Sequence, residues 1–259
     1  MTTTTRRLGS IDELSFSAVL SDLDGVVYRG DDAVPGAVGR FNRWQSEGVP
    51  YCFVTNNAEK APDAFADKIN KLGIACAPEQ VVTSGDVAFD YIRNQYVAGS
   101  GIYVIGTEAF KQRVAGAGYD LVESGASAVL VALDRSFNYA MMKTALGNVL
   151  DGARLIGTNP DLIRPLADGF EPGAGAITHS IAAASGAAPI FMGKPDPTIL
   201  KSALARLGVS AEDAIMIGDK LDTDILAGQR AGVTSIFVET GVPLDVQSAV
   251  TPDYILTSL

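Results

Sequence analysis

Polar side chains that could do chemistry stand immediately after apolar, strand-like runs of this 259-residue chain. Asp22 and Asp24 follow the first such run, a Thr-Asn-Asn segment at residues 55–57 follows the second, and Asp219 follows a run nearer the C-terminus. Lys194 follows a shorter apolar run. In doubly wound α/β sheets the carboxyl ends of the strands meet at one edge, where ligands bind. We therefore expect these side chains to share one edge of a sheet.

The pair Asp22 and Asp24, with one residue between them, allows two interpretations. Two carboxylates at a strand end can bind a metal ion, or can divide the roles of nucleophile and general acid. Alternatively, they form a polar turn in which Asp and Gly25 only end the strand. A buried, unpaired carboxylate is costly or takes up a proton. The polar groups that follow other strands therefore favour the chemical interpretation.

These carboxylates, hydroxyl and amide groups and one lysine suit Mg²⁺ and phosphate. Mg²⁺ takes carboxylate oxygens and commonly shares substrate phosphate. Asp22, Asp219 and Asp224 facing a phosphate dianion would bring five negative charges together. Each close pair of unit charges repels by about 4 kcal/mol at about 4 Å and an effective dielectric constant of about 20. Lys194 alone cannot offset this repulsion, so the sequence predicts Mg²⁺ as cofactor.

Composition excludes several classes of function. The net charge of −10 argues against nucleic-acid binding, which needs stripes of Lys and Arg. No apolar run is long enough to span a membrane. The two lone cysteines, Cys52 and Cys76, fit a reducing cytoplasm. Because His179 is the sole histidine and no G-x-S-x-G segment accompanies it, serine hydrolysis and multi-histidine zinc sites are disfavoured, and we expect a surface or cap residue.

Apolar runs that suit buried strands alternate with helical patterns. A run at residues 51–54 precedes a helical pattern at 62–72, and a run at 214–217 precedes one at 222–231. This alternation predicts βα units and an α/β fold with a doubly wound, Rossmann-like parallel sheet. The middle third repeats the alternation without any comparable set of strand-end acids. We therefore expect a separate α/β module inserted into the core.

Four motifs, in this order, resemble those of the haloacid dehalogenase (HAD) superfamily. They are Asp22-Leu23-Asp24-Gly25, Thr55-Asn56-Asn57, Gly193-Lys194-Pro195 and Gly218-Asp219-Lys220-Leu221-Asp222-Thr223-Asp224. The last two motifs, with Thr158-Asn159-Pro160-Asp161 and Pro172-Gly173-Ala174-Gly175, resemble subfamily IIA in particular. That branch contains NagD-like phosphatases, p-nitrophenyl phosphatases, phosphoglycolate phosphatases and pyridoxal phosphate phosphatases. The resemblance extends from about residue 18 to about residue 238.

The resemblance implies a Mg²⁺-dependent hydrolase of small phosphomonoesters that works through an aspartyl phosphate. By this resemblance Asp22 is the nucleophile, and Asp24 protonates the leaving group and then activates water. Thr55 and the Asn56 amide would hold the phosphate, and Lys194 would bind both Asp22 and the phosphate. The expected partner is a small-molecule phosphate ester rather than nucleic acid or membrane.

Metal ligands are implied by the same resemblance. Asp22, the backbone carbonyl of Asp24 and Asp219 would hold Mg²⁺, and Asp224 would act through water. The chain departs from the NagD-like pattern mainly at Lys220 and Asp222, which leaves the roles of these two residues open, like that of His179.

The expected domains are a core formed by residues 1–86 and 190–259 and an α/β cap formed by residues 87–189. The cap would cover the site and select the leaving group. Ser84 is expected to cap a helix over residues 86–95.

Three alternatives stay open at this point. A dehalogenase is disfavoured because carbon–halogen hydrolysis needs neither the acid Asp24 nor Mg²⁺. A phosphomutase or phosphotransferase of the same superfamily, and a non-catalytic phosphometabolite-binding protein, are the other two. The sequence leaves the substrate open among phosphoglycolate, glycerol phosphate, pyridoxal phosphate, nucleotides and sugar phosphates. It also leaves the oligomeric state open, with a homodimer among the assemblies it allows.

Overall fold

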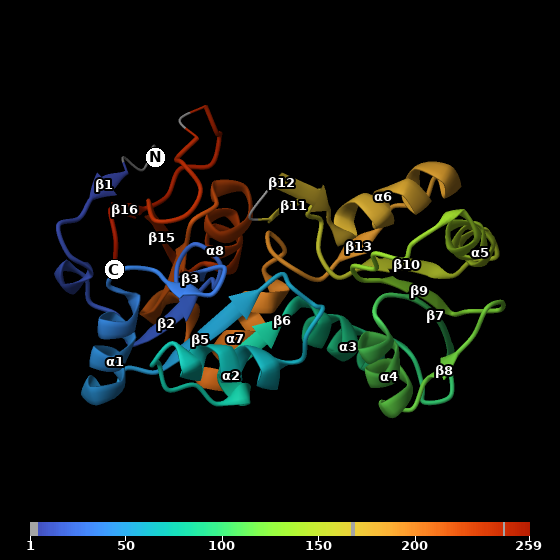
Figure 1. Ribbon diagram of the computed structural model, residues 1–259, viewed down its shortest axis with the longest axis horizontal. Helices are drawn as coiled ribbons and strands as arrows, with labels where there is room; N and C mark the ends of the chain where they lie inside the picture. The colour runs from blue at the N-terminus through green and yellow to red at the C-terminus, as the bar shows by residue number, and fades with distance from the viewer. Residues whose placement is uncertain (1–4, 167–168, 246) are drawn as a thin grey trace. The chain divides into compact units, whose positions relative to one another are not determined.

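The computed structural model describes residues 5–166, 169–245 and 247–259, which form two compact units (Figure 1). The core unit holds the described chain up to Thr55 together with Pro62–Val82 and Lys194–Leu259. The inserted unit holds Asn56–Ala61 and Thr83–Gly193. The predicted boundaries at residues 86/87 and 189/190 thus lie a few residues from those of the units. That Asn56–Ala61 belongs to the inserted unit was not predicted.

A seven-stranded sheet with the order β1-β16-β15-β14-β2-β5-β6 forms the centre of the core unit. The pairings along the sheet from β1 to β5 are all parallel, as a doubly wound fold requires. The strands are β1 (Arg6–Arg7), β2 (Ala18–Ser21), β5 (Tyr51–Thr55), β6 (Val81–Thr83), β14 (Ala214–Gly218), β15 (Thr234–Val238) and β16 (Tyr254–Leu256).

Helices cover both faces of this sheet. They are α1 (Ala37–Glu47), α2 (Pro62–Lys71), α7 (Thr198–Leu207) and α8 (Leu226–Ala231). On one face, Phe41 of α1 and Phe65 of α2 share a buried apolar cluster with Val19 of β2 and Phe53 of β5. Successive strand residues point to opposite faces, and the other face contacts α7 and α8. Because both faces are covered, the central strands β2, β5 and β14 are almost entirely apolar and buried.

The inserted unit has its own parallel sheet, with the order β13-β10-β9-β7-β8. Its strands are β7 (Gly101–Ile105), β8 (Asp120–Leu121), β9 (Ala128–Val131), β10 (Arg154–Gly157) and β13 (Ile190–Phe191). Its helices are α3 (Ser84–Gln95), α4 (Glu108–Gly116), α5 (Tyr139–Leu150) and α6 (Ala174–Ser185). An apolar cluster packs α5 and α6 against the sheet. The predicted α/β fold is therefore present.

Several local expectations differ from the structure. The side chain of Thr83, rather than that of Ser84, accepts a hydrogen bond from the Asp86 amide at the start of α3. An antiparallel hairpin of β11 (Ile163–Leu166) and β12 (Gly169–Pro172) was not predicted. A smaller hairpin, β3 (Tyr28–Arg29) and β4 (Asp32–Ala33), follows Asp24. Among the described residues, none of the helices has the length and apolar character needed to cross a membrane.

Candidate active site

Three neighbouring strands of the core sheet end in polar residues. β2 lies between β14 and β5, and the three strands run parallel. Asp22 directly follows β2, Thr55 is the last residue of β5, and Asp219 directly follows β14. Parallel strands end at the same edge of a sheet, so the fold brings these residues together.

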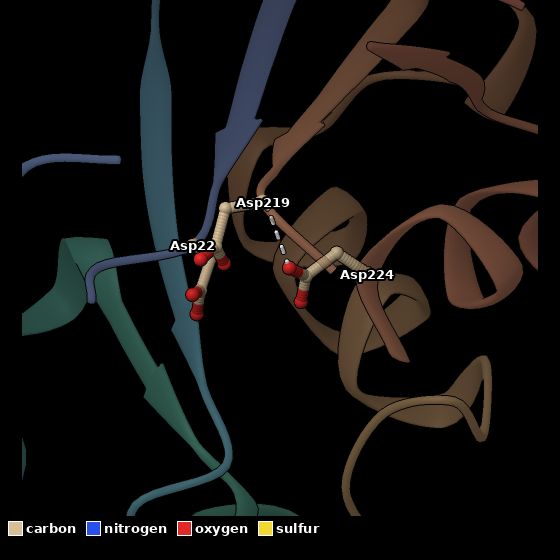
Figure 2. Close-up of side chains that lie close together, drawn as sticks. All are labelled: Asp22, Asp219 and Asp224. Carbon is tan, nitrogen blue, oxygen red and sulfur yellow. Dashed lines mark hydrogen bonds between the residues drawn. The ribbon is translucent and has the colours of Figure 1, made fainter. Parts of the chain in front are cut away.

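The carboxylates of Asp22, Asp219 and Asp224 form a buried acidic cluster (Figure 2). One oxygen of each lies within 4.8 Å of one oxygen of the others. Asp224 reaches the cluster from a π-helical turn, Leu221–Ile225, that follows the end of β14. This turn explains how two acids five residues apart in the sequence can meet at one point.

Lys194 is the buried cation of this cluster. Its Nζ atom donates to Asp22 Oδ1 at 2.6 Å and to the Val54 carbonyl at 3.0 Å, and lies 2.8 Å from Asp224 Oδ1. Only 2% of its side chain is exposed. The ammonium group therefore ties the end of β2 to the end of β5 and to the π-helical turn. Three carboxylates facing this one buried ammonium leave the cluster with an excess of negative charge.

Asp224 is held by protein donors at both of its oxygens. Its Oδ2 accepts hydrogen bonds from the backbone amides of Asp219 and Lys220, both at 3.1 Å, and its Oδ1 pairs with Lys194. A Cβ at Gly218 would lie 2.1 Å from the Asp224 Cβ, so only glycine permits this approach. Asp224 thus fixes the loop that carries Asp219, which suits a residue that acts on a metal indirectly.

The crowded carboxylates change the acidities of the cluster. Burial raises the pKa of Asp22 to about 8; Lys194 opposes this shift, and Asp224 and Asp219 add to it. Burial, and next the charge of Asp224, raise the pKa of Asp219 to about 6. Burial alone would lower the pKa of Lys194, but Asp22 and Asp224 outweigh it and raise this pKa. Burial away from water is thus the main cause of the raised pKa values of the two acids, and the neighbouring carboxylates are the cause of the raised pKa of Lys194.

Asp219 shows most clearly that the cluster suits a cation. Its Oδ2 accepts a hydrogen bond from the Val242 amide at 2.9 Å. Its Oδ1 is buried and has no hydrogen-bond partner among the described residues. A buried unpaired carboxylate oxygen is costly in a folded protein. Hard divalent cations take oxygen ligands of this kind, so the residues present fit a divalent cation.

The other predicted residues lie in the loops that leave the sheet. Asp24 is exposed and forms an isolated backbone bridge with Tyr28. The side chain of Thr55 is buried. Asn56 begins the inserted unit, where its carbonyl accepts hydrogen bonds from Ser84 Oγ at 2.6 Å and from Asn159 Nδ2 at 2.7 Å. Neither of these two hydrogen bonds was predicted from the sequence.

Comparisons with known proteins identify the family to which this chain belongs. Residues 19–120 match the family model described as haloacid dehalogenase-like hydrolase, and residues 191–259 match a HAD-hydrolase-like model. The chain is 37% identical over 240 residues to an acid sugar phosphatase of Staphylococcus aureus (strain MRSA252), covering 92% of each chain. The chain belongs to the haloacid dehalogenase-like hydrolases.

Solved structures of this HAD family place the chain in the NagD and p-nitrophenyl phosphatase branch. NagD from E. coli K-12 superposes with a TM-score of 0.86 at 32% identity, covering 95% of this chain and 97% of that one. A p-nitrophenyl phosphatase from Archaeoglobus fulgidus has a TM-score of 0.88 at 27% identity, with the same coverage. The predictions of a subfamily IIA member, of its α/β fold and of a phosphatase that hydrolyses small phosphate esters are confirmed.

One segment of this HAD phosphatase that contacts the acidic cluster was not predicted from the sequence. Residues 240–242 follow β15 and contact Asp219 through the Val242 amide. The only local signal was Gly241 shortly after a strand, and strand-end glycines are common in turns. His179, by contrast, lies exposed on α6 as expected.

Proposed function

We propose that this phosphatase transfers the phosphoryl group of its substrate to Asp22 and then to water, with Mg²⁺ as cofactor. The observation that carries the proposal is the buried cluster at the end of β2, in which three carboxylates face one lysine and Asp219 Oδ1 has no partner among the described residues. Such a cluster suits a divalent cation and a phosphate together.

The first step forms a bond between an Asp22 carboxylate oxygen and phosphorus, while the bond from phosphorus to the leaving oxygen breaks. Asp24 gives its proton to the leaving oxygen. In the second step the oxygen of a water molecule bonds to phosphorus while the bond from phosphorus to Asp22 breaks, and the water gives a proton to Asp24. Inorganic phosphate is then released and the Asp22 carboxylate is restored. Asp24 is exposed, which lets it exchange protons with solvent between steps.

Lys194, Thr55 and the Asn56 amide are the proposed phosphate ligands. Lys194 donates to Asp22 at 2.6 Å, so its charge lies beside the carboxylate that attacks phosphorus. Its raised pKa keeps it cationic at neutral pH. Catalysis by such groups consists mainly of positioning and of charge stabilisation in the transition state.

Asp22, Asp219 and the backbone carbonyl of Asp24 are the proposed Mg²⁺ ligands. When bound, Mg²⁺ neutralises charge on the transferring phosphoryl group. Asp224 stays out of direct ligation because protein donors occupy both of its oxygens.

The substrate class is a small phosphorylated metabolite, and the name of the S. aureus relative makes sugar phosphates the first class to test. We expect the purified protein with Mg²⁺ to hydrolyse p-nitrophenyl phosphate and to prefer one class in a panel of sugar phosphates, glycerol phosphate, phosphoglycolate, pyridoxal phosphate and nucleotides. Phosphate release measures the rates. A protein that binds these esters without releasing phosphate would contradict the proposal, and transfer of phosphate to a second hydroxyl of the substrate would indicate a phosphomutase.

We further propose that the inserted unit selects the leaving group. Within it, the guanidinium of Arg135 binds Glu171 at 2.8 and 3.0 Å and Glu59 at 2.5 Å, and Arg164 pairs with both glutamates. Glu59 follows Asn56, a proposed phosphate ligand in the same unit, by three residues, so their Cα atoms are at most about 11 Å apart. This ionic network therefore lies within a metabolite's reach of Asn56.

Arg135→Gln is expected to change KM for the larger esters of the panel by about 10-fold, because it removes charge-assisted hydrogen bonds. Acetyl phosphate, whose leaving group is small, should be hydrolysed as by the wild type. Arg154→Gln is the matched control, since Arg154 is an exposed arginine of the same unit outside the network. Equal preferences of the Arg135 variant and the wild type across the panel would contradict a role of this network in selection.

A cytoplasmic location, the absence of nucleic-acid and membrane partners, and a homodimer stay predictions from the sequence.

Cys52 and Cys76 are both free, and burial raises the pKa of each thiol to about 12, which makes them unreactive core residues.

A further inference from the structure

Residues 240–242 lie shortly after β15 in the chain. They hold the carboxylate of Asp219 from one side. The Val242 amide donates to Asp219 Oδ2 at 2.9 Å. Asp219 Oδ1 is buried without a hydrogen-bond partner among the described residues. One oxygen of this acid is therefore fixed by the backbone, and the other is left for a ligand from outside the protein.

Two glycines form the slot in which this carboxylate lies. A Cβ at Gly241 would lie 1.9 Å from Asp219 Oδ2, and one at Gly25 would lie 2.4 Å from the same atom. The Gly25 Cβ would also approach Gly241 Cα to 3.0 Å. The φ angle of Gly25 is +84°, whereas Gly241 is not among the glycines with positive φ. At Gly241, close approach to Asp219 is therefore the only reason why a side chain is excluded.

Side chains tie the 240–242 segment to the loop that carries Asp24. The Thr240 hydroxyl donates to the Gly25 carbonyl at 2.7 Å. Arg29, in the hairpin that follows, donates to the Gly241 carbonyl at 3.3 Å. The segment thus joins the Asp22–Gly25 motif to Asp219, the two parts of the chain that carry the proposed metal ligands.

We propose that residues 240–242 are positioning residues that present Asp219 Oδ1 to Mg²⁺. Val242 orients the carboxylate through its amide, Gly241 leaves the space in which the carboxylate lies, and Thr240 fixes the distance to the Asp24 loop. Groups that hydrogen-bond to a metal ligand commonly set the orientation of that ligand and the affinity for the metal in this way. This inference rests on the proposed function, because it assumes that Asp219 binds the metal.

Mg²⁺ titration of the metal-free protein by calorimetry tests the inference without any assay of activity. Gly241→Ala should weaken Mg²⁺ binding by about 10-fold or more, since the added methyl displaces the Asp219 carboxylate. Thr240→Val should weaken it by a smaller factor, and Thr240→Ser, which keeps the hydroxyl, should bind like the wild type. Gly39→Ala is the matched control, because a Cβ at Gly39 on α1 meets nothing within 4 Å.

The outcomes separate this inference from the proposed function. A wild-type protein that does not bind Mg²⁺ would overturn both the metal assignment and the inference. Wild-type binding with unchanged affinity in Gly241→Ala and Thr240→Val would overturn the inference alone, even if the two variants melt at lower temperature. If Gly241→Ala does not fold, the Val and Ser variants of Thr240 decide, and equal affinities of these two would overturn the inference.

Discussion

Asp22→Asn is expected to lower kcat by about 10³-fold or more while the protein stays folded. An amide keeps the shape of the carboxylate but cannot attack phosphorus. Lys194 keeps its ion pair with Asp224 at 2.8 Å, so the buried ammonium is not left without a counter-charge. The substitution also leaves fewer carboxylates crowded around the Lys194 ammonium group. We therefore expect the melting temperature to stay near that of the wild type.

Steady-state hydrolysis of p-nitrophenyl phosphate and thermal unfolding measure these two effects. Asp67→Asn is the matched control, since Asp67 is an exposed acid on α2 of the same unit. Activity of the Asp22 variant near that of the control would show that another group takes the phosphoryl group.

Removal of Mg²⁺ is expected to abolish activity, and its return to restore it. The buried cluster holds three carboxylates and one lysine, and a phosphate dianion would add two further negative charges. At about 4 Å and an effective dielectric constant of about 20, each like-charged pair costs about 4 kcal/mol. A divalent cation is the group that offsets this repulsion.

Chelation with EDTA followed by titration with Mg²⁺ measures the dependence. Asp219→Asn should shift the half-saturating Mg²⁺ concentration upward by about 10-fold or more, because it removes the charge from the carboxylate whose Oδ1 is unpaired. Full activity in the chelator would show that the cluster of Asp22, Asp219 and Asp224 works without a metal.

The strand-end residues were predictable because their signal is local. An apolar run followed by an acid indicates a buried strand and a polar edge, as for Asp22 and Asp219. The contact between Lys194 and Asp22 spans 172 residues. Its prediction came from the family resemblance, since neither periodicity nor charge can pair residues so far apart.

Other features were not predictable because tertiary contacts decide them. The approach of Gly241 to Asp219 depends on where the chain runs after β15, and no periodicity records it. The hairpin of β11 and β12 contains Pro165 and Pro172, which interrupt the usual strand pattern. Thr83 and Ser84 are both good capping residues, so their order in the sequence could not tell which of them caps α3.

The central claim is that the phosphoryl group passes through Asp22, and chemical trapping in the Asp24→Asn variant tests it most directly. p-Nitrophenolate leaves without help from an acid, whereas the attack of water needs the base, so the phosphorylated enzyme should accumulate. Borohydride reduces an aspartyl phosphate to homoserine, which peptide mass spectrometry locates. We expect homoserine at position 22, dependent on substrate and Mg²⁺, and none there when Asp22→Asn is added. Homoserine at a different position, or none while the wild type turns over, would contradict the account.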